Sequence, residues 1–173
     1  MRCFLAIELT EELKEKIGEL QNNFKINGIK SVEKENLHIT VKFLGDIDDE
    51  MLEKIKNLDL SLSPIKTPIK EVGVFPNENY MKTIWVGAPK LTNTLKEIDE
   101  KISELGFKKE RSYIPHITIG RVKFIKDKNH LKEKIEKYKN IKFDNLEVKN
   151  IVLIGSQLTE KGPIYTTIKK YTK

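Results

Sequence analysis

The chain has 173 residues, with 32 Lys and Arg against 26 Asp and Glu, a formal net charge of +6 and a single cysteine. This length suits one domain, or one domain built from two small lobes. No stretch approaches the 18 or more apolar residues of a membrane span, and the acidic residues from Glu8 onward are untypical of a signal peptide. Since Cys3 is alone, it forms no internal disulfide and no multi-cysteine metal site. We expect a globular, cytoplasmic protein without a membrane segment.

Almost all of the positive charge comes from lysine, because the only arginines are Arg2, Arg111 and Arg121. The lysines alternate with glutamates, a pattern that is typical of solvated helix and strand faces. A net charge of +6 favours polyanions such as RNA through long-range attraction, without any readout of sequence. The charge by itself does not decide a function.

Strand and helix signals alternate in the first half of the chain. Residues 2–9 form a short apolar run that predicts a buried strand. Thr10 is a suitable N-cap for a helix whose apolar stripe follows at helical spacing, through Leu13, Ile17, Leu20 and Phe24. Residues 37–44 predict a second strand, and a second helix is expected from Asp48 to Leu58.

The second half repeats this order. Strands are expected at 69–75 and 83–87, then a helix at 91–105 that ends at Gly106. A strand follows at 113–122, where Pro115 indicates an edge position or a strand start. A helix at 129–139 and strands at 146–154 and 163–170 complete the chain. The pattern predicts an α+β fold with two sheets and internal pseudo-symmetry.

One short motif occurs twice. His38-Ile39-Thr40-Val41 and His116-Ile117-Thr118-Ile119 each lie in a strand-like segment, 78 residues apart, in a chain of only three histidines. Because strand side chains alternate between faces, each motif presents His and Thr on one face and buries its β-branched residues on the other. Each histidine alone has a structural alternative, as a buried side chain satisfied by the backbone. The repetition favours a shared functional site.

Two histidines and two threonines suit acid–base chemistry on a phosphate. Imidazoles titrate near pH 6.5, so that one acts as a base and the other as an acid, while hydroxyl groups hold phosphate oxygens. The sequence has no H-E-x-x-H zinc motif, no marked serine-type triad and no G-x-x-x-x-G-K-[ST] loop. We therefore expect no metal and no cofactor. His130, at the start of a charged helix, is expected to be a surface or capping residue.

Phe43 lies five residues after His38, and Arg121 lies five residues after His116. Strict alternation turns Arg121 away from His116, but a bulge at Gly120 would return it to the same face, where a guanidinium suits a phosphate. The alternative is a surface arginine at a strand end. Phe43 either stacks on a base or belongs to the core.

Three segments carry a resemblance to a known family. NLHITVKFLG, GVFPNENYMKTIWVG and GFKKERSYIPHITIGRVK resemble, in order, blocks of the two-histidine phosphoesterases. The chain is most similar to their bacterial and archaeal 2′-5′ RNA ligase-like branch, described as RNA 2′,3′-cyclic phosphodiesterases. The similarity runs from RCFLAIEL to at least Lys123.

The resemblance implies a bilobal domain over 1–173, in which two pseudo-symmetric lobes, each an antiparallel sheet with helices outside, enclose a central cleft. It implies that His38 is the proton donor and His116 the proton acceptor. Thr40, Thr118 and Arg121 match positions that contact the phosphate, and the reaction opens an RNA 2′,3′-cyclic phosphate to a 2′-phosphomonoester.

Three alternatives stay open at this stage. The same site would serve a 2′-5′ RNA ligase that joins tRNA halves. A non-catalytic module would use it to bind RNA ends, and another phosphodiesterase would act on a small cyclic nucleotide. None of these readings requires a protein partner.

Overall fold

A computed structural model describes all residues, 1–173, of the chain. Nine strands and four α-helices follow one another in an α+β order. The strands are β1 (Arg2–Glu8), β2 (Ile29–Ser31), β3 (His38–Asp46), β4 (Ile65–Asn77), β5 (Tyr80–Gly87), β6 (His116–Val122), β7 (Lys142–Val148), β8 (Ile151–Thr159) and β9 (Gly162–Tyr171). The α-helices are α1 (Glu11–Asn22), α2 (Asp49–Lys56), α3 (Thr92–Ser103) and α4 (Lys128–Tyr138), with 3₁₀ turns at Lys34–Asn36 and Pro89–Leu91. None of the helices is both long and apolar enough to cross a membrane.

Two antiparallel sets of strands meet at the middle of the molecule. The strand order is β7-β4-β5-β6-β3-β1-β8-β9, with β2 paired to β6. The two sets are joined at β3 and β6, where Ile39 pairs with Ile117, and both side chains are fully buried. The α+β class and the two-lobed arrangement are confirmed, and the two expected sheets are continuous through this one pair.

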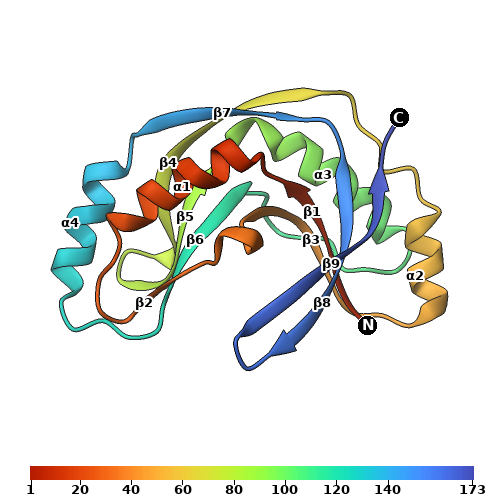
Figure 1. Ribbon diagram of the computed structural model, residues 1–173. Coiled ribbons are helices and arrows are strands. Elements are labelled where there is room, and N and C mark those ends of the chain that lie inside the picture. Colours follow the sequence, from red (N-terminus) through yellow and green to blue (C-terminus); the bar gives the residue numbers. More distant parts are fainter.

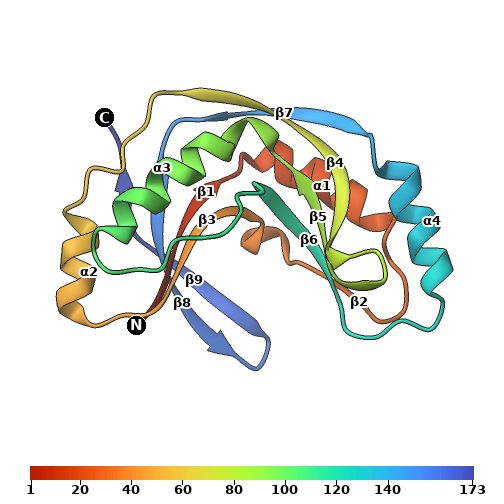
Figure 2. The same cartoon turned by 180° about the vertical axis from the view of Figure 1, so that it is seen from behind.

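Helices α1 and α3 cover one face of the central strands (Figures 1 and 2). Helix α1 packs against β6, and α3 packs against β3, so that each helix reaches the strand of the other lobe. Their apolar stripes bury residues such as Leu13, Ile17, Ile98 and Ile102 in the main core. The opposite face of β3 and β6 is turned away from these helices, toward the open side of the arch, where the β8–β9 hairpin projects.

Most predicted elements are present, with shifts at their ends. The strand expected at 113–122 begins only at His116, directly after Pro115, which has no N–H for a ladder. The strand expected at 146–154 is wrong as a single element, because β7 ends at Val148 and β8 begins at Ile151. The two strands belong to opposite ends of the sheet, a distinction that an apolar run does not reveal.

One lysine departs from the solvated pattern. The Lys42 side chain of β3 is only 3% exposed, and its Nζ lies 2.7 Å from Asp99 Oδ1 of α3 and 2.9 Å from Glu110 Oε1. The other oxygen of Asp99 accepts hydrogen bonds from Tyr113 Oη at 2.6 Å and from the Glu110 N–H at 2.8 Å. The carboxylate of Asp99 raises the pKa of Tyr113 to about 12. This network ties β3, α3 and the segment before His116 together.

We expect Lys42→Met to lower the free energy of unfolding by about 3–5 kcal/mol, because it leaves the buried Asp99 carboxylate without its cation. Denaturant unfolding measures the loss. Lys54→Met is the matched control, since Lys54 pairs with Glu50 on the exposed face of α2 and its loss should change little. Equal effects of the two substitutions would contradict the role given to the buried pair.

Candidate active site

The two motifs lie side by side on adjacent strands. Around the Ile39–Ile117 pair, the antiparallel register sets His38 across from Thr118 and Thr40 across from His116. Because both isoleucines point into the core, these four side chains share the opposite face, which we call the histidine face. The structure thus brings together all four motif residues that the sequence singled out.

Backbone carbonyl groups orient both imidazole rings. His38 Nδ1 lies 2.7 Å from the Asn36 carbonyl oxygen, and His116 Nδ1 lies 2.6 Å from that of Ile114. A carbonyl oxygen only accepts, so Nδ1 carries the proton and donates in each ring. Nε2 is therefore the nitrogen that each neutral histidine keeps for proton transfer.

The two Nε2 atoms differ in their partners. His38 Nε2 lies 2.8 Å from Thr40 Oγ1 of the same motif. No protein group forms a hydrogen bond with His116 Nε2, since the ring bonds only through Nδ1. The local pseudo-symmetry is therefore broken at the nitrogen atoms that matter for chemistry.

Each histidine packs against two aromatic rings. The His38 ring lies 5.0 Å from Phe4 and 5.5 Å from Tyr165, measured between ring centroids. The His116 ring lies 4.9 Å from Phe75 and 5.9 Å from Trp85. These rings shield the imidazoles from water and restrict their movement. Sequence analysis missed all four, because strand periodicity does not show which distant strands become neighbours.

A bulge lies at the last residue of each motif. In β3, Thr40 pairs with Ala6 and Lys42 with Leu5, so that Val41 is the extra residue. In β6, Thr118 pairs with Trp85 and Gly120 with Ile84, so that Ile119 is the extra residue. An extra residue reverses the alternation beyond it.

The two bulges return the fifth residue after each histidine to the histidine face. The bulge considered at Gly120 is present one residue earlier, at Ile119, and Arg121 follows it. Phe43 is 68% exposed and lies 6.0 Å from the Phe4 ring, so that it is no core residue.

Burial and positive charge act on both imidazoles. Burial is the main cause that lowers the pKa of His38 below its usual value near 6.5, against the opposing hydrogen bond to Asn36. The Arg121 charge lowers the pKa of His38 further, and it also lowers the pKa of His116, where burial again is the main cause. Arg121 thus lies close enough to act on both rings. His130 stands apart, exposed near the start of α4.

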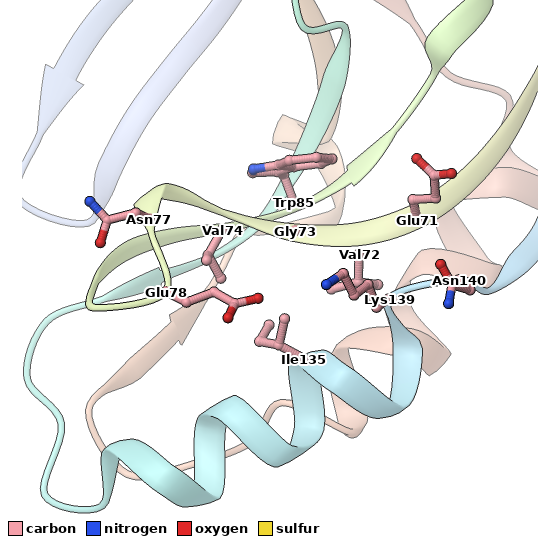
Figure 3. Close-up of a pocket in the computed structure, with 10 residues that line it drawn as sticks. All are labelled: Glu71, Val72, Gly73, Val74, Asn77, Glu78, Trp85, Ile135, Lys139 and Asn140. Atoms are coloured by element: carbon pink, nitrogen blue, oxygen red, sulfur yellow. The ribbon is translucent and has the colours of Figure 1, made fainter.

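A cavity of about 530 Å³ lies along β4 and does not contain either motif histidine. Figure 3 shows Trp85 over β4 at Gly73, with Ile135 of α4 and Lys139, directly after that helix, on the other side. A Cβ atom on Gly73 would come within 2.3 Å of the Trp85 ring, so glycine is needed there. Trp85 also packs against His116, and its buried indole N–H has no hydrogen-bond partner.

The chain was compared with models of protein families. A model described as LigT like phosphoesterase matches residues 7–85 and again residues 86–165. Each match contains one His-x-Thr motif, in agreement with the duplication seen in the sheet.

Proteins of known name match over nearly the whole chain. The RNA 2′,3′-cyclic phosphodiesterase of Methanocaldococcus jannaschii is 58% identical over 173 residues, covering 99% of this chain and 100% of that protein. The protein of the same name from Archaeoglobus fulgidus is 33% identical and covers 99% of both chains.

Solved structures share the fold. The protein TT0787 of Thermus thermophilus superposes with a TM-score of 0.82 at 25% identity, covering 98% of this chain and 96% of that one. Escherichia coli LigT, crystallised with 3′-AMP, superposes with a TM-score of 0.78 at 23% identity, covering 98% and 95%.

Proposed function

The chain belongs to the LigT-like phosphoesterase family, and we propose that it hydrolyses RNA 2′,3′-cyclic phosphate ends to 2′-phosphomonoesters. The observation that carries the proposal is the pair of imidazoles on one face, each with Nδ1 bonded to a carbonyl and Nε2 left for the reaction. Relatives named RNA 2′,3′-cyclic phosphodiesterase support the reaction and the RNA substrate. The whole chain, 1–173, acts as one bilobal domain in the cytoplasm.

The proposed reaction uses one histidine as a base and the other as an acid. His116 Nε2 removes a proton from a water molecule, whose oxygen forms a bond to phosphorus in line with the leaving group. The bond from phosphorus to the 3′ oxygen breaks, and His38 Nε2 gives that oxygen its proton. The product has a 2′-phosphate and a free 3′ hydroxyl. The unpartnered Nε2 of His116 supports its assignment as the base.

The remaining groups of the site hold the phosphate. The hydroxyl groups of Thr40 and Thr118 donate to its non-bridging oxygens, and Arg121 balances the charge that builds up on them. When His38 is charged, its Nε2–H donates to Thr40 Oγ1, so the hydroxyl hydrogen of Thr40 is free to donate to the phosphate. Phe43, exposed beside Phe4, stacks on a base of the RNA. This set of groups works without a metal or a cofactor.

Pure protein, incubated with EDTA and without ATP, should convert an RNA ending in a 2′,3′-cyclic phosphate to one ending in a 2′-phosphate. Each histidine supplies about 10²–10⁴-fold in rate, so His38→Ala and His116→Ala should each lose several orders of magnitude. His130→Ala, on the exposed start of α4, is the matched control and should keep full activity. Product analysis by phosphate-specific chromatography measures the conversion.

The outcomes of this assay separate the alternatives. Activity that returns only with zinc or manganese would rule out the metal-free mechanism. Binding without turnover would indicate an RNA-end binding module, and joined RNA halves would indicate a ligase. With sulfur in place of the 3′ oxygen, the leaving group needs no protonation. This substrate should restore the activity of His38→Ala far more than that of His116→Ala. Restoration of His116→Ala instead would exchange the two roles.

The pH dependence should shift when Arg121 is removed. The free enzyme needs one imidazole charged and one neutral, so kcat/KM follows a bell whose limbs lie at the two histidine pKa values. Because both pKa values are lowered, the maximum should lie below about pH 6.5. Arg121→Ala removes a cation that lowers both pKa values, so the bell should move to higher pH.

The matched control for this shift is Arg111→Ala. Arg111 does not act on the pKa of either histidine, and its removal should leave the bell in place. A bell that stays in place, or moves to lower pH, in Arg121→Ala would show that the guanidinium does not lie against the imidazoles.

A further inference from the structure

A second unpaired arginine lies on the histidine face, beyond His38. Every ion pair in the structure is made by a lysine, so neither Arg121 nor Arg2 has a carboxylate partner. Arg2 is exposed at the start of β1, and Asp46 stands across from it in β3 without forming an ion pair. Strand alternation places Arg2 on the same face as Phe4 and Ala6.

The ladder connects Arg2 directly to the surroundings of His38. Arg2 pairs with Ser156 of β8, and Ser156 pairs with Tyr165 of β9, so that the three form one row across the strands. Two strand spacings separate Arg2 from Tyr165 by about 10 Å between Cα atoms, within reach of an arginine side chain. The Tyr165 ring is in turn 5.5 Å from the His38 ring. Tyr165 therefore lies between the catalytic pair and Arg2.

The hairpin that carries Tyr165 is fixed beside the motif. Asn36, whose carbonyl orients His38, also donates from Nδ2 to the Pro163 carbonyl at the start of β9, at 3.4 Å. The row from Arg2 to Tyr165 is thus held in place relative to the imidazole. The positive charges of both Arg121 and Arg2 act on Tyr165.

We propose that Arg2 binds an internucleotide phosphate near the cyclic end of the RNA, with Tyr165 supporting the nucleotide between the two phosphates. This inference rests on the proposed function, and it predicts a preference for RNA chains over mononucleotides. An unpaired guanidinium beside an aromatic ring is the combination that proteins use to hold single-stranded RNA. The charge of one phosphate at Arg2 adds about one unit to the salt dependence of binding.

The test compares a mononucleotide 2′,3′-cyclic phosphate with a tetranucleotide that ends in one. Arg2→Gln should lower kcat/KM for the tetranucleotide about five- to tenfold and leave the mononucleotide within twofold. Lys96→Gln, on the exposed side of α3, removes one charge elsewhere and should change neither substrate. A methylphosphonate at one of the last two linkages should cause the same loss in the unchanged protein, and no further loss in Arg2→Gln.

Each outcome bears on one proposal. Inactivity of the unchanged protein on both substrates would overturn the proposed function itself. Activity on both, with no effect of Arg2→Gln or an equal effect on the two substrates, would overturn only the role of Arg2. If the losses from Arg2→Gln and from the methylphosphonate multiply, the Arg2 guanidinium does not contact the replaced phosphate. That result would also overturn the role of Arg2.

A different observation concerns the bulge before Arg121. Gln21 of α1 is buried, and its Nε2 donates to two carbonyl oxygens, those of Val32 and Ile119, both at 2.9 Å. Ile119 is the extra residue of the bulge, and its carbonyl also accepts from the Val32 N–H at 3.0 Å. Without Gln21, the Val32 and Ile119 carbonyls lose a buried donor that no other side chain supplies.

We infer that Gln21 is a positioning residue for Arg121, which it holds on the histidine face by fixing the bulge. Gln21 itself touches neither the histidines nor the phosphate. Its amide acts at the point where the alternation of β6 reverses, two residues before Arg121. Loss of these hydrogen bonds lets the strand relax toward regular pairing, which turns the guanidinium away.

A double-mutant cycle with the mononucleotide substrate tests this inference. Gln21→Met, of similar length but without a donor, should lower kcat/KM about tenfold in the unchanged protein and less than twofold in Arg121→Ala. Gln21→Ser gives the same cycle should the methionine variant fail to fold. Thr67→Val is the control: it removes a buried hydroxyl of β4 that accepts from the Lys90 N–H, and it should lower Tm without lowering kcat/KM. Equal losses in both backgrounds would show that Gln21 stabilises the fold alone.

Discussion

The contact on which the site depends is a single pair of isoleucines. Ile39 and Ile117 join β3 to β6, and the strands separate on either side of them. Because both side chains fill the core, the residues before and after them must point to the opposite face. The position of this apolar pair therefore places the four motif side chains, two histidines and two threonines, next to one another on the histidine face. A shift of one residue in this pairing would bury the histidines and expose the isoleucines.

Each lobe stabilises the functional strand of the other. Helix α1 reaches β6 with the buried amide of Gln21, and α3 reaches β3 with the carboxylate of Asp99. Both polar contacts fall at a bulge, where regular pairing is interrupted and side chains would otherwise lose their orientation. The chemistry differs because the bulge in β3 brings Lys42 into the interior, while the bulge in β6 has Gly120 at the same offset. The buried Lys42 of β3 needs a counter-charge, whereas the carbonyl at the bulge of β6 needs only a hydrogen-bond donor.

The sequence predicted the motif face but not its surroundings. Alternation within a strand is a local property, so the pairing of His38 with Thr40 and of His116 with Thr118 on one face followed from four residues. Phe4 and Tyr165 come next to His38 from strands that are distant in the chain, and no local pattern specifies such pairings. The interior place of Lys42 was missed for the same reason. Its partner Asp99 lies 57 positions away, in a helix that looks ordinary by its apolar stripe.

In the proposed mechanism a symmetric frame carries out an asymmetric reaction, since one imidazole gives a proton while the other takes one. The frame orients both rings alike, through two carbonyl groups at almost the same distance from Nδ1. The differences come from residues outside the repeated motif. Thr40 bonds to His38 Nε2, whereas His116 Nε2 has no such partner. Arg121 of β6 has Phe43 in the matching place of β3, so the cation that acts on both imidazoles has no counterpart in the repeat. Duplication thus accounts for the shared position of the two histidines, and the unequal partners of their Nε2 atoms are the difference on which the proposed roles rest.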